Sequence, residues 1–500
     1  MAQISTRWRC HKSTNKTSYP VRECLAWTGK NATMTSKSRS EYAPLLGKDL
    51  EDPPSPSAEA PPIARPQLVC TYIIENTLSM YMVSNVLTLP INQFYVYNEV
   101  AKSYGIPNYI QNEDASICDQ KNDSEAADVL NNIQKEASEQ LMYMSFLSSF
   151  TAVIPTFFLG YTSDRFGRKV SFLITLIGLF LHQLVYIIVF YLEAPLPYLY
   201  IGCALEGVTG YMSCALMTAF IMLADVTSPG KQRGFRIVLT EGIMASSASL
   251  AFMGGGFLIK YSGFLIPMLC STALCMVTIL VWLVVVPETR PFRENHNHHG
   301  MSLNSIKRCF VFYYEKASPN RRGKMSVVLV ILVMAATCFV SKSNVVTLFL
   351  LGQPFCWSEV HITVVSSLQI LINWIAGISF LRLIQRVLRD VSLLSFGCFM
   401  GMVAMIPLAL AQQNWMIYLY MVIASFSVLV LPISRSILSK MVSPEEQGSL
   451  FAGIAAMEHL VTGCGGLLFG EIYKDTVTFF PGLVFFVIAG LVLLSLILSG

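Results

Sequence analysis

Twelve apolar stretches, each about as long as a membrane-crossing helix, fill most of the chain after Leu68. Numbered as spans 1 to 12, they lie near residues 68–92, 141–160, 170–192, 196–223, 236–259, 264–286, 326–350, 360–382, 391–411, 415–439, 449–470 and 479–499. Every span is predicted to be helical, because a strand open to lipid leaves backbone groups without hydrogen-bond partners. Only 13% of the residues are charged, against about 25% in soluble domains. The sequence therefore predicts an all-α membrane protein of twelve transmembrane helices.

Charge and motif content argue against several other classes of protein. The net charge of +4 is small, and no basic patch with interleaved aromatic residues indicates a nucleic-acid partner. Neither C-x-x-C nor H-E-x-x-H is present to indicate a metal site, and no motif indicates an enzyme. We therefore expect no metal and no cofactor.

The distribution of charge predicts the orientation in the membrane. Loops after spans 2, 4, 6 and 8 are rich in Lys and Arg, whereas the longest opposite loop, about 95–140, is acidic. By the positive-inside rule both termini are predicted to be cytosolic. Residues 1–66 are polar and rich in Ser, Thr and Pro, as expected of a disordered cytosolic tail, and Met34 is an alternative start to Met1.

A charged decapeptide between spans 2 and 3 is the most specific motif in the chain. A dense cluster of charge is tolerated here only where the backbone leaves the lipid, and two glycines permit a tight turn with positive φ. The pattern G-x-x-x-D-R-x-G-R-K resembles the loop between helices 2 and 3 of the major facilitator superfamily of secondary transporters. Its residues are Gly160, Asp164, Arg165, Gly167, Arg168 and Lys169. The alternative is an ordinary basic anchor, which requires neither the glycines nor the acid.

A second motif recurs and indicates an internal duplication. Ser228-Pro229 follows span 4 and Ser443-Pro444 follows span 10, with an offset of 215 residues and a Gln three positions after each proline. The predicted organisation is a six-helix half over 67–286, a cytosolic linker over 287–325 and a second six-helix half over 326–500. Two such halves enclose a central cavity that opens to alternate sides.

Several charged residues lie inside spans, where insertion costs about 3 kcal/mol each and favours a cavity or a partner. They are Glu75, Glu206, Asp225, Glu241, Arg435 and the neighbours Glu458 and His459. Each has a structural alternative. Asp225 could cap a loop, Glu241 could reach the cytosolic surface, Glu206 could be an interhelical hydrogen-bonder, and His182 is a core histidine or a proton relay.

Arg435 with these acids suggests a chemistry. A fixed guanidinium can bind a carboxylate or phosphate through two nitrogens, and a buried carboxyl group can carry a proton. A fixed cation and a protonatable acid are together the minimum set of groups needed for proton-coupled uptake of an organic anion.

Two cysteines lie in loops on the side opposite the cytosol. Cys118 is in the acidic loop and Cys356 lies between spans 7 and 8, so a disulfide between the halves is expected in an oxidising compartment. Asn122 begins a glycosylation sequon on the same side.

The block from Ser434 to Phe451 resembles the solute-carrier family of the proton-coupled folate transporter, the thymic stromal cotransporter and their lysosomal relative. So do Pro354–Trp357, Ala224–Val226 and Gln93–Tyr97, and the resemblance covers nearly everything from about residue 68 onwards. It implies proton coupling and substrate binding at Asp225, Glu241 and Arg435, and a disulfide between Cys118 and Cys356. Glu75 and the stretch from Phe451 to Glu458 are closer to the lysosomal relative.

One departure from the folate carrier concerns span 7. That carrier has a proton-coupling histidine there, whereas this chain has Cys338-Phe339-Val340. Proton coupling would then rest on carboxylates, and folate, bacterial muropeptides and other anionic catabolites are all candidate substrates.

The tail contains a candidate sorting motif. Glu41, Leu45 and Leu46 fit the acidic dileucine pattern that clathrin adaptors read, which favours an endosomal or lysosomal membrane over the plasma membrane. The sequence thus predicts a proton-coupled transporter of a small organic anion towards the cytosol. The alternatives are a facilitator or antiporter, or a non-transporting sensor that signals through its tail.

Overall fold

The computed structural model describes residues 65–106, 124–227, 231–289, 319–384, 390–428, 430–442 and 447–499. The first group of helices comprises α2 (Arg65–Ser103), α3 (Ser124–Phe166), α4 (Arg168–Leu192), η5 (Leu196–Tyr198), α5 (Leu199–Val208), α6 (Tyr211–Val226), α7 (Lys231–Ser262) and α8 (Leu265–Val284). The second group comprises α10 (Pro319–Val340), α11 (Ser343–Leu351), α12 (Glu359–Ile384), α13 (Asp390–Ala409), α14 (Asn414–Ala424), α15 (Val430–Lys440), α16 (Gln447–Thr476) and α17 (Leu483–Ser499).

The predicted all-α membrane fold is confirmed. Among the described residues, nine helical stretches are long and apolar enough to cross a membrane. Two shorter apolar helices, α14 and α17, and the more polar α2 coincide with the remaining predicted spans. The chain is therefore a multi-pass membrane protein.

Two helices run well beyond the predicted spans. Span 1 was expected to end near residue 92, but α2 continues to Ser103, and α3 begins at Ser124 rather than near 141. Much of the predicted acidic loop is thus helix, because an α-helix satisfies its own backbone hydrogen bonds and can continue into water. α2 ends just before Gly105, whose φ of 85° suits the left-handed conformation common after helices.

The charged decapeptide is also more helical than expected. α3 continues through Phe166 and α4 begins at Arg168, so the turn is confined to Gly167. The predicted positive φ occurs there, at 104°, whereas Gly160 lies within α3. The side chains of Asp164 and Arg165 lie outside the described part of the structure.

Three predicted spans are broken rather than continuous. Span 4 divides into α5 and α6 at Thr209 and Gly210, span 7 into α10 and α11 at Ser341 and Lys342, and span 10 into α14 and α15. Gly210 has a φ of 99°, a conformation that ends the regular helix. Backbone groups freed inside a membrane protein are tolerated where protein side chains satisfy them.

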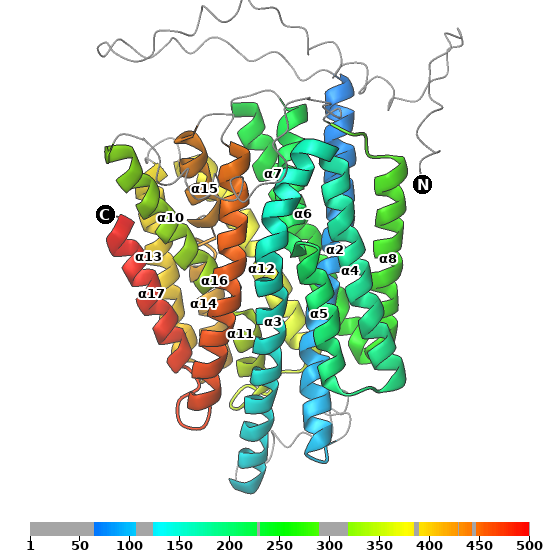
Figure 1. Cartoon of the computed structure of the whole chain (residues 1–500). Helices are drawn as coiled ribbons and strands as arrows, with labels where there is room; N and C mark the ends of the chain where they lie inside the picture. The colour runs from blue at the N-terminus through cyan, green and yellow to red at the C-terminus, as the bar shows by residue number, and fades with distance from the viewer. Residues whose placement is uncertain are drawn as a thin grey trace, which may run out of the picture.

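The two groups of helices stand side by side in Figure 1, the first at the right in blue to green and the second at the left in yellow-green to red. α3 packs along α16, and α7 packs along α12, so each pair joins one group to the other. Charged residues on α7, α15 and α16 can therefore meet at the junction between the groups.

Candidate functional site

Arg435 and Glu458 form an ion pair between α15 and α16. The Arg435 Nη2 and Nε atoms lie 2.7 Å and 3.2 Å from Glu458 Oε1, and both donate to it. The side chains are 30% and 13% exposed, so the pair is neither fully buried nor free in solvent. Since both nitrogens share one oxygen, the contact is not the two-oxygen fork in which an arginine binds a carboxylate most specifically.

Glu241 supplies a second acid from the other group of helices. It lies on α7, is half-buried, and interacts electrostatically with Arg435. The guanidinium thus contacts one carboxylate and interacts electrostatically with a second, so the three groups carry a net charge of −1 when both acids are ionised. The structure brings together these three predicted site residues, Arg435, Glu458 and Glu241.

Glu75 lies in a different contact. Its Oε1 atom is 3.0 Å from Arg236 Nε and accepts a hydrogen bond of 2.9 Å from the Thr240 hydroxyl group. The Arg236 guanidinium also lies 4.6 Å from the centroid of the Tyr72 ring. Among its described contacts, Glu75 therefore joins α2 to α7 rather than contributing to the Arg435 cluster.

Arg236 is a residue that the sequence analysis did not single out. It lies in α7 and its side chain is only 9% exposed. The signal was the acid Glu75, which in an apolar span requires a partner.

Asp225 joins the charged turn between α3 and α4. Its Oδ2 atom lies 3.5 Å from Arg168 Nε and accepts a hydrogen bond of 3.3 Å from Thr289. Arg168 also donates to Ser163 at 2.9 Å. These contacts join the end of α6 to the start of α4 and to the chain after α8, rather than forming the loop cap that was the structural alternative for Asp225.

Glu288 completes the turn and was not predicted. Its two carboxylate oxygens accept hydrogen bonds from the backbone N–H groups of Arg168 and Lys169, at 2.9 Å and 3.1 Å. The start of α4 is thereby capped by a negative charge, as the helix dipole favours. A Cβ atom at Gly167 would lie 2.3 Å from Glu288 Oε2, so this close approach requires glycine.

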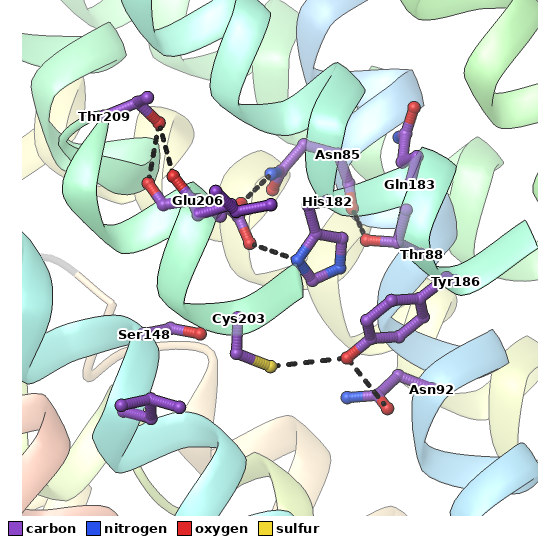
Figure 2. Close-up of polar contacts among 12 residues, drawn as sticks. Asn85, Thr88, Asn92, Ser148, His182, Gln183, Tyr186, Cys203, Glu206 and Thr209 are labelled. Carbon is purple, nitrogen blue, oxygen red and sulfur yellow. Dashed lines mark hydrogen bonds and ion pairs between the residues drawn. The ribbon is translucent and has the colours of Figure 1, made fainter. Parts of the chain in front are cut away.

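Glu206 and His182 form a second buried pair within the first group (Figure 2). His182 Nδ1 on α4 lies 3.1 Å from Glu206 Oε2 on α5, and both side chains are 8% exposed. Asn85 on α2 donates to Glu206 Oε1 at 3.3 Å. The His182 ring stacks on Tyr186, with centroids 4.2 Å apart. Glu206 is thus an interhelical partner, as one of the alternatives held.

Comparison with known proteins adds a likeness to transporters. The model of the Major Facilitator Superfamily matches residues 129–341. The lysosomal proton-coupled steroid conjugate and bile acid symporter of Gallus gallus is 27% identical over 431 residues, covering 85% of this chain and 92% of the relative. The proton-coupled folate transporter of Rattus norvegicus is 26% identical over 416 residues, covering 83% and 88%. Over residues 129–341 the chain is thus similar to the Major Facilitator Superfamily.

Two solved transporter structures share the fold. The human organic anion transporter MFSD10 (TETRAN) has a TM-score of 0.64 and 14% identity, with 87% of this chain and 100% of that chain covered. A D-xylose-proton symporter has a TM-score of 0.63 and 14% identity, covering 86% and 97%. The twelve-helix major facilitator fold predicted from the sequence accords with these likenesses.

Hydrogen bonds hold the two groups of helices together at the end of the bundle where α2 ends. There Gln93 donates to Asn344 at 2.8 Å and accepts from Thr347 at 3.0 Å. On α3, Gln134 accepts a hydrogen bond of 2.9 Å from Tyr473 of α16. These bonds join the first group to the second, so the transporter is closed at this end.

The remaining predicted sites fall largely outside the described residues. Cys356 is disulfide-bonded, but Cys118 lies in the segment that the structure does not describe, so their pairing stays a prediction. The same holds for the glycosylation site Asn122 and for the sorting motif in the tail.

Proposed function

We propose that the protein is a proton-coupled symporter that carries a small organic anion towards the cytosol. The observation that carries the proposal is the position of Arg435, which contacts Glu458 at 2.7 Å and interacts with Glu241 across the junction between the groups. A cation shared by two acids at this junction can bind an anion and respond to protons at one place.

The geometry suggests how the two ligands are coupled. While Glu458 is ionised, it holds two nitrogens of Arg435 and competes with any incoming anion. A proton on Glu458 removes that charge, and the guanidinium becomes available for bidentate binding of a carboxylate, sulfate or phosphate group. Glu241 on α7, which interacts electrostatically with Arg435, would add to this effect when it takes up a proton. Binding of a proton and binding of the anion therefore favour each other.

The relatives support an amphipathic anion as the substrate. The curated relatives are described as transporters of steroid conjugates, bile acids or folate, and as proton-coupled. We propose a substrate of the same kind, with an anionic group for Arg435 and an apolar or aromatic body; muropeptides and other anionic catabolites remain candidates.

The proposed location is the endosomal or lysosomal membrane, with both termini in the cytosol. The basic loops, the dileucine motif and the lysosomal description of one relative support it. Clathrin adaptors would then be the partners of the tail, and an acidic lumen would supply the protons. We also propose that the chain comprises two six-helix halves over 67–286 and 326–500, joined by a cytosolic linker.

Uptake at the cell surface tests the proposal. Replacing Leu45 and Leu46 with Ala should retain the protein at the plasma membrane, where labelled steroid sulfate, bile acid, folate and muropeptide are offered at acidic and neutral external pH. We expect uptake of at least one probe to be stimulated by acid and abolished by Arg435→Ala. Absence of uptake of all four, with the protein shown at the surface, would contradict the proposal and favour the sensor. Equal uptake at acidic and neutral external pH would favour a facilitator.

A further inference from the structure

The buried pair of His182 and Glu206 has no part in the cluster around Arg435. It lies where α4 packs against α5, inside the first group, and Asn85 holds Glu206 from α2 (Figure 2). The second ring contact of His182 is a hydrogen bond to the backbone of Gly202. Both side chains are therefore buried among contacts from α2, α4 and α5.

Among the described residues, the groups that interact with the pair supply no compensating charge. In the described part of the chain, the titratable groups that interact with Glu206 are Tyr81 of α2, Tyr186 of α4, Cys203 of α5, Tyr211 of α6 and Cys275 of α8. Phenol and thiol groups are uncharged at ordinary pH. α3 contributes Ser148, which hydrogen-bonds Cys203 and carries no charge.

Relative to a neutral imidazole beside an ionised carboxylate, the pair must bind one further proton to be neutral. With one proton the pair is neutral overall, whether the proton is on His182 or on Glu206. Without it the pair carries a net negative charge, and with two protons a net positive charge, either of which is costly in a buried site. A purely structural contact would be made at lower cost by uncharged groups of similar size.

A break in the helix lies one turn from Glu206. α5 ends at Val208, and the Thr209 hydroxyl group donates to the backbone carbonyl of Glu206 at 2.8 Å. Gly210 and Tyr211 follow with φ values of 99° and 53°. The left-handed conformation at Tyr211 is unusual for a residue with a side chain.

The same break touches the second group of helices. His459 of α16 hydrogen-bonds the backbone of Gly210, and its ring centroid lies 5.9 Å from that of Tyr211. His459 is adjacent in sequence to Glu458, the partner of Arg435. Movement of α16 against the first group must therefore change the contacts of the break beside Glu206.

We propose that His182 and Glu206 form a second proton-binding site, which exchanges its proton when movement of α16 at the break between α5 and α6 admits water to the pair. This inference rests on the proposed proton-coupled transport and adds a site to it. Arg435 and its acids bind the anion, while the His182–Glu206 pair couples the proton to the change in conformation.

The first test uses proteoliposomes and measures two activities separately: counterflow of the substrate without a gradient, and accumulation of the substrate driven by a proton gradient. Glu206→Gln keeps the shape and the contact with Asn85 but cannot release a proton. We expect it to retain counterflow of a labelled steroid sulfate without a gradient and to lose proton-driven accumulation about tenfold or more. Glu471→Gln, on the exposed face of α16, is the matched control and should accumulate like the wild type. Proton-driven accumulation by Glu206→Gln at the wild-type level would overturn the proposal.

A second measurement needs no substrate and separates failure of this site from failure of the transport proposal. Infrared difference spectra of the purified wild type between acidic and alkaline buffer should contain a carboxyl band that Glu206→Gln lacks and Glu471→Gln retains. His182→Gln should change the pH at which this band disappears. If the wild type accumulates none of the probes but shows this band, the transport proposal fails and the site stands. A spectrum unchanged by Glu206→Gln overturns the site.

Discussion

At the scale of single residues, the account depends on the shape of the Arg435 guanidinium as well as its charge. Two of its nitrogens contact Glu458 Oε1, a contact that the single ammonium group of lysine cannot reproduce. The same geometry would let the guanidinium bind the anion through two nitrogens. We expect Arg435→Lys to lower uptake about tenfold, because the loss of one charge-assisted hydrogen bond to the anion costs about 1.5 kcal/mol. Initial uptake rates normalised to surface protein would measure this. Rates equal to wild type would show that only the charge matters.

Glu458→Gln should alter the dependence of anion binding on pH. In the wild type, binding should weaken as pH rises, because ionised Glu458 then occupies the guanidinium. The amide cannot ionise, so binding to the variant should change much less with pH, while proton-driven accumulation falls. Equilibrium binding of a labelled steroid sulfate to purified protein over a pH series provides the measurement. A slope as steep as in the wild type would remove Glu458 from the coupling.

The sequence indicated which charged residues need a partner, but not which partner each of them has. Arg435, Glu241 and Glu458 were predicted because charge in an apolar helix needs a partner, and the structure places them together. Glu75 and Asp225 have their own partners, Arg236 and Arg168. Pairing between distant helices depends on how they rotate and pack, which apolar composition alone does not specify.

At the scale of elements, the contact between Glu75 and Arg236 joins α2 to α7. Removing one partner of a buried ion pair leaves an uncompensated charge and costs about 3 kcal/mol or more. Arg236→Gln should therefore lower the thermal unfolding temperature of the purified protein clearly. The double variant Glu75→Gln with Arg236→Gln should recover part of the loss. A double variant less stable than either single variant would contradict this assignment.

The sequence located the helices but not their breaks. Span 4 reads as one apolar run, yet it divides at Gly210, and spans 7 and 10 divide likewise. Hydropathy reports the burial of side chains and carries no information on backbone dihedral angles. The helix extensions at Ser103 and Ser124 were missed for a related reason, since polar helix and polar loop have similar composition.

At the scale of the whole molecule, transport requires the two groups to separate at the end where they are now closed. α7 and α12 approach each other closely there. A Cβ atom added at Gly256 of α7 would lie only 1.8 Å from Thr363 Oγ1 of α12. Gly256→Ala should hold this end apart and slow the transport cycle. The matched control is Gly254→Ala, since a Cβ atom at Gly254 would meet nothing within 4 Å.

Labelling would report the position of this end directly. A cysteine placed at Asn344 should react faster with a maleimide in the Gly256→Ala background than in the Gly254→Ala background. Equal labelling and equal transport in both would show that closure at this end does not depend on the contact between α7 and α12.

Proton movement driven by substrate tests the central claim most directly. Proteoliposomes containing a trapped pH indicator and no initial pH gradient would be given a labelled steroid sulfate, bile acid or folate outside. The account predicts that the lumen acidifies as the label enters, and that Arg435→Ala abolishes both signals together. Entry of label through the wild type without acidification would show a transporter that is not coupled to protons, and would contradict the account.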